Sequence, residues 1–529
     1  MTSPRVLMIG LDGFELSVAE PLIAAGRLPA IEQLRRRSAF VRLDHGAARR
    51  TGLAWEHVSS GLAPADARRW AAVDFDPATY EVRQEPTALT PFPAQLGART
   101  VVFDPPYFDL AASPSVQGLV SWGAHDPGVA AASRPASLSG EIKRRFGRYP
   151  ANPYIYGFVW PSEPRARAMG QALQQATRLR SDIAEWLFCQ RLPDWDLGIV
   201  VVSEFHSAIE ALWHGIDPAH PLHHLPSARP ARDGIEGVYE AADRMIARLQ
   251  GAMPDARLVV FNLHGMGANN SDVPSMVLLS ELMHRRAFGS RLMREPSWRT
   301  TAAGLPLLAD GETWLGAMAD SFGEPRRAPD GLLRRIARRL DPLRAKRRPS
   351  SLDWMPATRY RRFWPEMPAF ALPSFYDGRI RVNLAGREAR GVVPLARYGE
   401  VLGELEALLG DCADPLTGQP VVADIERCAS ANPLALSRSE ADLVIEWRGA
   451  PMAFEHPQLG RIGPLPYRRT GGHTGGHGVA WLSGAGIAAG DFGVSSAFDV
   501  VPTVIDMLGE PRSERISGAS LLPRVSAAA

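Results

Sequence analysis

The first residues that suggest chemistry are polar side chains that directly follow short apolar runs. Val6–Ile9 is apolar, and Asp12 comes soon after it, between Gly10 and Gly13. In open α/β sheets, ligands bind beyond the carboxyl ends of the strands. Glycines beside a carboxylate also let backbone and ligand approach closely. Asp12 is therefore a candidate binding residue, and the capping of a following helix is the alternative.

A second candidate is the loop Arg49–Gly61, in which Thr51 follows two arginines and precedes a predicted helix. A hydroxyl at a helix N-terminus, with amide donors and cations beside it, suits attack on a phosphoryl group and stabilisation of the charge that develops. Arg49 and Arg50 are the cations. The residues alone do not separate this role from simple capping of the helix by Thr51.

Histidine and glutamate recur at a spacing of four residues after the apolar run Leu197–Val202. If the segment is helical, His206, Glu210 and His214 lie along one face. Imidazole with carboxylate is a usual ligand mixture for divalent metals. A polar helix surface is the alternative, but the position directly after a predicted buried strand favours a metal site.

Two glycine-rich segments also carry histidines. His264 lies in Phe261–Gly267, at the end of an apolar run, and His473 and His477 lie in Thr470–Gly478, before one. Glycines next to histidine remove side-chain bulk, so a metal and a substrate can come close to the backbone. One such histidine is more often structural, but two of them beside the other clusters favour a ligand role.

Short apolar runs bounded by polar or turn residues predict strands that are covered on both faces. They alternate with helical patterns, and this alternation predicts an α/β fold with a doubly wound, mostly parallel sheet flanked by helices. The predicted strands are 6–9, 197–202, 258–261 and 479–482, and the predicted helices are 17–25, 31–37, 166–187, 235–249 and 398–409.

Two segments interrupt this alternation. Residues 66–160 are rich in Pro, Ala and Asp, and residues 285–375 contain the basic stretch Arg326–Arg348. The basic stretch is typical of a solvated amphipathic helix rather than of nucleic-acid or membrane binding. We predict that both segments are cap insertions over the carboxyl edge of the sheet, and that the core comprises residues 1–65, 161–284 and 376–529.

Composition narrows the class of protein. Lysine and arginine total 59 and aspartate and glutamate total 57, so the net charge of +2 gives no sign of a nucleic-acid partner. No apolar run approaches the roughly 20 residues of a membrane span. The 3 cysteines, Cys189, Cys412 and Cys428, are too scattered to form a disulfide framework. We therefore expect a globular cytoplasmic protein with neither a membrane nor a nucleic-acid partner.

The order of these motifs along the whole chain resembles the alkaline phosphatase superfamily. The resemblance is to its type I phosphodiesterase/nucleotide pyrophosphatase-like members and its predicted phosphohydrolase/phosphomutase branch. No single segment decides the resemblance, but the number and order of the segments argue against chance. Further matching segments are 134–138, 146–150, 195–197, 217–221, 369–372, 380–388, 499–509 and 517–521.

This resemblance implies an alkaline-phosphatase-like fold, a phosphoryl reaction and a set of ligands. Members of the family use two metal ions, usually zinc or manganese and about 4 Å apart, to clamp the attacking and leaving oxygens. Thr51 matches the nucleophile. The residues implied as metal ligands and intact here are Asp12, Thr51, His264 and His473. The candidate substrate-binding residues are Arg49, Arg50, His214 and His477.

This chain departs from the family pattern at three positions. Where relatives keep Asp-x-x-x-His, it has His206 and Glu210, which exchanges the order but retains one imidazole and one carboxylate. With His473 they supply two nitrogens and one carboxylate, a workable set of ligands. Leu263 takes the place of the aspartate in Asp-His-Gly and cannot coordinate a metal. The second ion therefore loses an anionic ligand and should bind more weakly.

We expect a divalent metal cofactor, zinc first and manganese or iron as alternatives, with one or two ions bound. The predicted function is a metal-dependent phosphohydrolase or phosphodiesterase that acts on a small-molecule phosphoester through Thr51. Alternatives remain open: phosphoryl transfer or another biosynthetic reaction on the same fold, a degenerate member without turnover, and single-metal iron chemistry on two histidines and one carboxylate. Residues that can replace the missing ligand are Glu56, His57, Glu204, His214, Asn262 and His477.

Overall fold

The computed structural model describes residues 5–84, 87–125, 128–156, 162–294, 298–301, 304–309, 312–323, 350–428 and 432–526. The basic stretch 326–348 of the sequence analysis lies outside these ranges. Within them, no helix combines the length and the apolar character that a membrane crossing requires.

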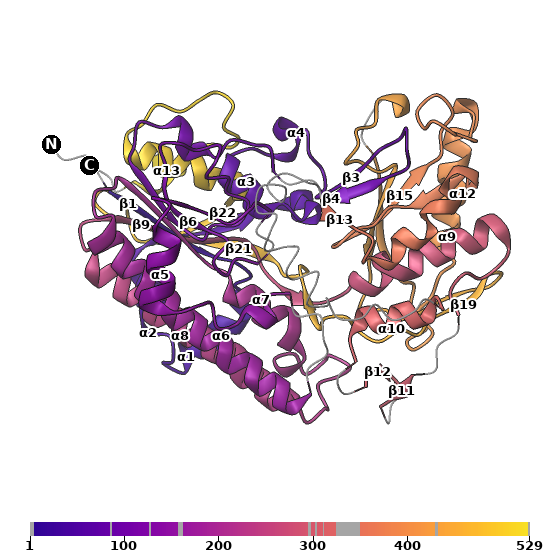
Figure 1. Ribbon diagram of the computed structural model, residues 1–529, viewed down its shortest axis with the longest axis horizontal. Helices are drawn as coiled ribbons and strands as arrows, with labels where there is room; N and C mark the ends of the chain where they lie inside the picture. Colours follow the sequence, from indigo (N-terminus) through magenta and orange to yellow (C-terminus); the bar gives the residue numbers. More distant parts are fainter. Residues whose placement is uncertain are drawn as a thin grey trace.

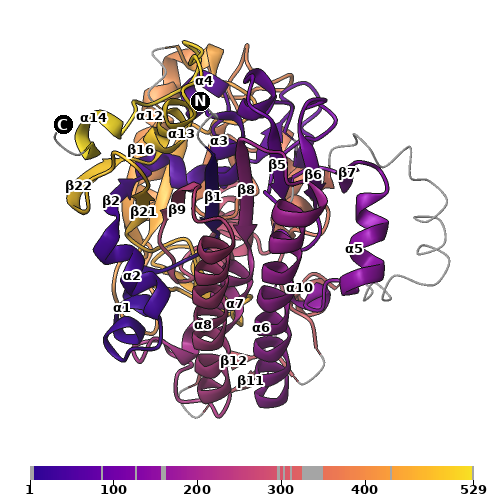
Figure 2. The ribbon, with the colours of Figure 1, turned by 90° about the vertical axis from the view of Figure 1, so that its left-hand side faces the viewer.

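Nine strands form the central sheet: β1 (Val6–Leu11), β2 (Ala39–Asp44), β5 (Thr100–Phe103), β6 (Gln117–Val120), β7 (Ala132–Arg134), β8 (Leu197–Val202), β9 (Arg257–His264), β21 (His477–Ser483) and β22 (Gly490–Ser496). Their order is β22-β2-β21-β9-β1-β8-β5-β6-β7, and Figure 2 shows them side by side in this order. The neighbours β9, β1, β8, β5 and β6 are parallel, whereas β21 is antiparallel to both of its neighbours and β7 is antiparallel to β6.

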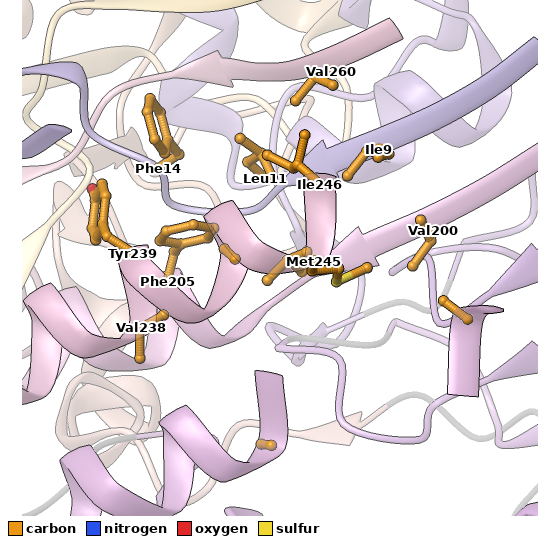
Figure 3. Close-up of a cluster of buried hydrophobic side chains, with 14 of the residues drawn as sticks. Ile9, Leu11, Phe14, Val200, Phe205, Val238, Tyr239, Met245, Ile246 and Val260 are labelled. Carbon is orange, nitrogen blue, oxygen red and sulfur yellow. The ribbon is translucent and has the colours of Figure 1, made fainter. Parts of the chain in front are cut away.

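Strand β1 is buried on both faces because successive side chains of a strand point to opposite sides of the sheet. Leu7, Ile9 and Leu11 pack into one core cluster, and Val6 and Met8 pack into another. Figure 3 shows Ile9 and Leu11 in the first cluster, among side chains from the neighbouring strands and from the helices that cover this face. The double burial explains why β1 is apolar throughout, up to Asp12.

Helices cover both faces of the central sheet, as Figure 1 shows. One face carries α1 (Leu16–Ala24), α2 (Pro29–Arg37), α6 (Glu163–Trp186), α7 (Glu204–Leu212) and α8 (Ala228–Ala252), and the other carries α3 (Ala54–Ser60) and α13 (Val500–Leu508). The predicted α/β fold with a doubly wound, mostly parallel sheet flanked by helices is confirmed. The remaining helices of this part are α4 (Pro64–Ala67), α5 (Leu138–Phe146) and α14 (Leu522–Val525).

A second lobe, on the right of Figure 1, has its own sheet and core. Its strands β14 (Ala369–Ala371), β15 (Gly378–Val382), β17 (Leu443–Trp447) and β16 (Val422–Arg427) pair antiparallel in that order. Helices α9 (Leu279–Phe288), α10 (Trp314–Ser321) and α12 (Tyr398–Gly410) contribute to the same core. Strand β4 (Val82–Gln84) pairs with both β3 (Val73–Phe75) and β13 (Ser350–Ser351) in a small sheet. Strand β11 (Arg299–Thr300) pairs with β12 (Pro306–Leu307), and β18 (Phe454–His456) pairs with β19 (Gly460–Ile462).

A two-stranded ladder joins the points where the chain leaves the central sheet for the second lobe and returns. Strand β10 (Gly267–Ala268) pairs antiparallel with β20 (Gly471–Gly472). The segment that leaves the central sheet and the segment that returns to it are therefore neighbours. This ladder lies directly after His264 and directly before His473 in the sequence.

The structure divides the chain differently from the sequence-based prediction. Residues 66–160 were expected to be a cap insertion, yet β5, β6 and β7 of this range belong to the central sheet. Residues 376–529 were expected to be core, yet they supply β15, β16 and β17 of the second lobe. The strands in question are three to six residues long. Runs this short, separated by irregular chain, carry little periodic signal.

Candidate functional site

The polar residues singled out by the sequence meet at one edge of the central sheet. Strands β1, β8 and β9 are parallel, so their carboxyl ends lie together. Asp12 follows β1, His206 and Glu210 lie in the helix after β8, and His264 ends β9. Because β21 is antiparallel to β9, its beginning lies at the same edge, together with the glycine-rich segment that carries His473.

Three of the side chains form a compact group, namely His125, His206 and Glu210. One ligand atom of each lies within 4.8 Å of the others, and no second group of this kind occurs in the part of the chain that the structure describes. His206 Nε2 is 3.3 Å from Glu210 Oε1, and His125 Nε2 is 3.4 Å from Glu210 Oε2. The two imidazole rings stack with centroids 3.8 Å apart. We call this group the His206 side.

The burial of Glu210 tests whether the His206 side fits a metal ion. Glu210 is fully buried, and neither carboxylate oxygen has a hydrogen bond of normal geometry to any of the described residues. The guanidinium of Arg469 contacts Oε1, but it is shared with Asp272, which it binds at 2.8 Å. A buried carboxylate is unfavourable unless charge and hydrogen bonds compensate it. Two imidazoles and one carboxylate are also the protein ligands of many catalytic zinc sites, so the group fits a divalent ion.

Beyond His473 the site continues as a chain of imidazoles. His473 Nδ1 lies 2.8 Å from His264 Nε2, and His264 Nδ1 lies 3.0 Å from His45 Nδ1. His45 Nε2 in turn lies 3.1 Å from His57 Nδ1. Leu263 shares the lining of a small cavity with His45 and His57. We call His45, His57, Leu263 and His264 the His264 side.

One order of hydrogen-bond donors is consistent with every contact between neighbouring imidazoles of the chain. His206 Nδ1 lies 3.2 Å from both carboxylate oxygens of Asp12, so it must carry the hydrogen there. In the neutral form of His206 with this hydrogen, Nε2 is the bare nitrogen, and it accepts from His473 Nε2 at 3.1 Å. The bare nitrogen also faces Glu210. Asp12 therefore orients His206 in the way that carboxylates orient metal-binding histidines in other proteins.

The imidazoles of His45, His57, His264 and His473 are neutral near pH 7 because their pKa values are lowered. Burial lowers the pKa of His57 to about 3. Burial also lowers the pKa of His264 to about 4, with a further contribution from Arg49. The pKa values of His45 and His473 are held well below the ordinary value, first by burial and then by neighbouring imidazoles. Neutral imidazole is the form that binds metals.

Thr51 ends the 3-10 helix Gly46–Thr51, beside the cavity at the sheet edge. Its hydroxyl donates to the carbonyl of Ala48 at 2.7 Å and accepts from the amide of Leu53 at 3.1 Å. The next residue, Gly52, has a φ of 72° and lines the cavity. The hydroxyl is thus bound to its own loop, one residue away from the cavity wall.

The two arginines before Thr51 reach toward the second lobe. Arg49 donates to the carbonyl of Gly475 at 3.0 Å and to Glu446 of β17 at 3.4 Å. Arg50 donates to Glu426 of β16 at 2.6 Å. Arg49 lines the cavity at the sheet edge, so it can contact an anion there. Arg50 lines a neighbouring cavity instead.

A cavity of about 40 Å³ lies between the His206 side and the His264 side. Asp12, His206 and His264 form part of its polar wall, and Trp55, Tyr107 and Leu263 form part of its apolar wall. The second lobe contributes Tyr376, whose ring meets that of His473 edge-on with centroids 4.2 Å apart. A larger cavity of about 320 Å³ adjoins it at Arg49 and His264. The small cavity offers room for a compact group and the larger one for the rest of a ligand.

The two histidines predicted at the substrate lie in different surroundings. His214 is fully buried, and its Nε2 lies 3.2 Å from the hydroxyl of Ser227. His477 is exposed and lines the larger cavity. The geometry brings His477 to the ligand space, whereas His214 lines neither cavity.

Comparison with known proteins identifies the fold. No family model and no curated protein sequence matches the chain. Among solved structures, the wild-type alkaline phosphatase PafA matches with a TM-score of 0.52 and 10% sequence identity over 100% of both chains. The chain has the alkaline phosphatase fold.

Two further solved structures match the chain at lower TM-scores. Phosphonoacetate hydrolase from Sinorhizobium meliloti 1021, in complex with phosphonoformate, has a TM-score of 0.44 and 14% identity over 91% of this chain and 89% of that chain. Human ectonucleotide pyrophosphatase/phosphodiesterase 5 has a TM-score of 0.47 and 11% identity over 99% of this chain and 100% of that chain.

Several residues of the site were not found by sequence reasoning. His125 follows β6, and the strand-end argument would have found it had residues 117–120 been identified as a strand. His45 directly follows β2 and was missed for the same reason. His57 was considered only as a replacement ligand. Tyr376 carries no local signal, because the folding of the second lobe alone brings it to His473.

Proposed function

We propose that the protein hydrolyses a small phosphoester with one divalent ion bound on the His206 side. The observation that carries this proposal is the buried group His125, His206 and Glu210 at the ligand-binding edge of an alkaline phosphatase fold. A divalent ion bound there supplies Lewis acidity to a phosphoryl oxygen. PafA, which has a similar structure, is an alkaline phosphatase, and this supports the same class of reaction.

The residues around the cavity have separate tasks in this proposal. Arg49 binds the phosphoryl oxygens, as the planar guanidinium does in many phosphate sites. Asp12 orients His206. Thr51 is the attacking group: its hydroxyl gives up the hydrogen bond to Ala48, and Oγ1 bonds to phosphorus as the bond from phosphorus to the ester oxygen breaks. The hydroxyl proton leaves with the ester oxygen as the free alcohol. Water then takes the phosphoryl group and returns a proton to Oγ1. The small cavity takes the phosphoryl group, and the larger cavity takes part of the alcohol.

A second ion does not fit the His264 side. Leu263 is buried and supplies no ligand atom. Both nitrogens of His264 already face other imidazoles, at 2.8 and 3.0 Å. The guanidinium of Arg49 is close enough to lower the pKa of His264. We therefore propose one ion, with Arg49 supplying part of the positive charge that a second ion supplies in related enzymes.

A second candidate rests on the same ligand atoms. Two histidines and one carboxylate also hold iron(II) in non-haem oxygenases. The fold favours phosphoester hydrolysis, whereas the ligand set alone does not distinguish zinc from iron. Metal analysis of the purified protein separates the two: iron without zinc or manganese would favour the second candidate.

The proposal is tested with metal-loaded protein and two generic esters, an aryl phosphate monoester and a bis-aryl phosphate diester. We expect one ion per chain and turnover of at least one ester, lost on chelation and restored by zinc or manganese. Thr51→Ala should abolish turnover, and Thr51→Ser should retain most of it. Equal activity of Thr51→Ala and wild type would remove Thr51 from the mechanism. Absence of both ion binding and turnover in the wild type would refute the proposal.

A further inference from the structure

A fully buried arginine lies behind the His206 side. Arg180, in α6, donates from Nε and Nη2 to the two carboxylate oxygens of Glu204, each at 2.9 Å. Its Nη1 donates to Asp104 at 3.0 Å. All three side chains are completely buried. Burial disfavours the charged guanidinium, but the two carboxylates outweigh this effect and raise the pKa of Arg180, so it stays charged.

The two carboxylates belong to the two segments that carry the candidate ligands. Glu204 is the first residue of α7, the helix that carries His206 and Glu210. Asp104 follows β5 and accepts hydrogen bonds from the backbone amides of Trp122 at 2.7 Å and Gly123 at 2.9 Å. These amides lie two and three residues before His125. One guanidinium therefore connects the segment of His125 to the helix of His206 and Glu210.

We propose that Arg180 is a positioning residue for the ion site, because it fixes the segment that carries His125 relative to the helix that carries His206 and Glu210. The inference rests on the proposed ion on the His206 side. Arg180 does not line the cavity, so it acts through Glu204 and Asp104. Well-packed apolar residues are often as stable as a buried ion pair. Stability alone therefore does not explain why three charges are buried here, whereas the fixed geometry of a bidentate pair does.

The second lobe offers a matched control. Arg381 of β15 is also buried, donates to Glu388 at 2.7 Å, and binds the carbonyls of Ser437 and Glu440. Its guanidinium lies over the ring of Phe75, as that of Arg180 lies over the rings of Phe103 and Trp122. It belongs to the core of the second lobe rather than to the segments of the ion site. Its loss should therefore affect folding of that lobe without changing the ion site.

The test is titration of the metal-free protein with Co²⁺, followed by the visible absorption of the bound ion, together with thermal unfolding of each variant. Arg180→Lys keeps the charge but loses the fork, and Arg180→Met loses both. We expect both variants to bind Co²⁺ about 10- to 100-fold more weakly, with an altered spectrum. Arg381→Met should unfold at a lower temperature but retain the Co²⁺ affinity and spectrum of the wild type.

A double-mutant cycle with His125→Ala shows whether the effect passes through this ligand. If it does, Arg180→Lys should weaken Co²⁺ binding less in the His125→Ala background than in the wild type. Should Arg180→Met fail to fold, Asp104→Asn replaces it in the same comparison. If Arg180→Lys and the second variant, Arg180→Met or Asp104→Asn, both kept the wild-type Co²⁺ affinity and spectrum, the positioning role would be overturned. The proposed ion site would still stand. No Co²⁺ binding by the wild type would instead overturn the ion site on which the inference rests.

Discussion

The His206 side and the His264 side meet at His473, but they differ in their carboxylates. The His206 side retains one, Glu210, with His125 and His206 around it. The His264 side has Leu263 where the sequence resemblance implies an aspartate, and its imidazoles bind one another instead. Without a carboxylate, the imidazoles of the His264 side form a neutral hydrogen-bond network, whereas those of the His206 side converge on Glu210.

The largest expected effect is that of removing one imidazole from each side in turn. His206→Ala should reduce bound ion to near zero and ester turnover by about 10³-fold, because the ion supplies several kcal/mol of transition-state stabilisation. His57→Ala, on the other side, should retain the ion and most of the activity. Metal content and kcat of the two variants check this. Equal losses in both would mean that the two sides do not differ in function.

Restoring the missing carboxylate should break the difference between the sides. Leu263→Asp places an anionic group next to His264, and we expect a second equivalent of zinc to bind. Without metal the variant should be less stable by about 3 to 5 kcal/mol, because the new charge is buried without a partner. Isothermal titration with zinc and unfolding with and without zinc measure both effects. Leu263→Asn is the matched control, and a second ion in that variant would contradict the role of charge.

Acid should destabilise the His264 side. The pKa values of His57 and His264 are lowered in the folded protein to about 3 and about 4, from an ordinary value of 6.5. Between pH 6.5 and pH 4 the unfolded chain binds more protons than the folded protein does. The free energy of unfolding should therefore fall as the pH falls from 6.5 toward 4. Urea unfolding of the metal-free protein across this range measures it.

A substituted protein isolates the contribution of one buried imidazole to this pH dependence. His57→Gln removes a group that titrates, so its stability should change less with pH than that of the wild type. The exposed His224, changed to glutamine, serves as the control and should leave the pH dependence unchanged. An unchanged pH dependence in His57→Gln would contradict a buried neutral His57.

The smallest expected effect concerns Tyr376, whose ring the second lobe places against His473, the residue at which the two sides meet. Tyr376→Phe keeps the edge-on contact with His473, whereas Tyr376→Ala removes it. We expect Tyr376→Ala to raise KM several-fold with little change in ion content, and Tyr376→Phe to resemble the wild type. Steady-state kinetics with metal analysis distinguishes this from loss of the ion, which would lower kcat instead.

The sequence was sufficient for the fold and located some of the residues on each side of the site. Buried parallel strands such as β1 and β8 are uninterrupted apolar runs, and polar residues after them, such as Asp12 and His206, can be located by that rule alone. Strand β6 has only four residues, and β2 is interrupted by Arg42 and is only half-buried, so neither is an uninterrupted apolar run and His45 and His125 were missed. Thr51 was expected to face a phosphoryl group, but the hydrogen bonds of its hydroxyl to its own loop depend on backbone geometry that no motif reveals.

The ladder between β10 and β20 has a consequence for how this architecture diversifies. Because the segments that lead into and out of the second lobe are paired, most of that lobe is attached through two neighbouring strands. Recombination that exchanges the part of the second lobe between β10 and β20 would leave the strand ends of the central sheet and their histidines in register. The new lobe would also have to pack against residues 73–84. New substrates can then be acquired by swapping one module rather than by rebuilding the reaction centre.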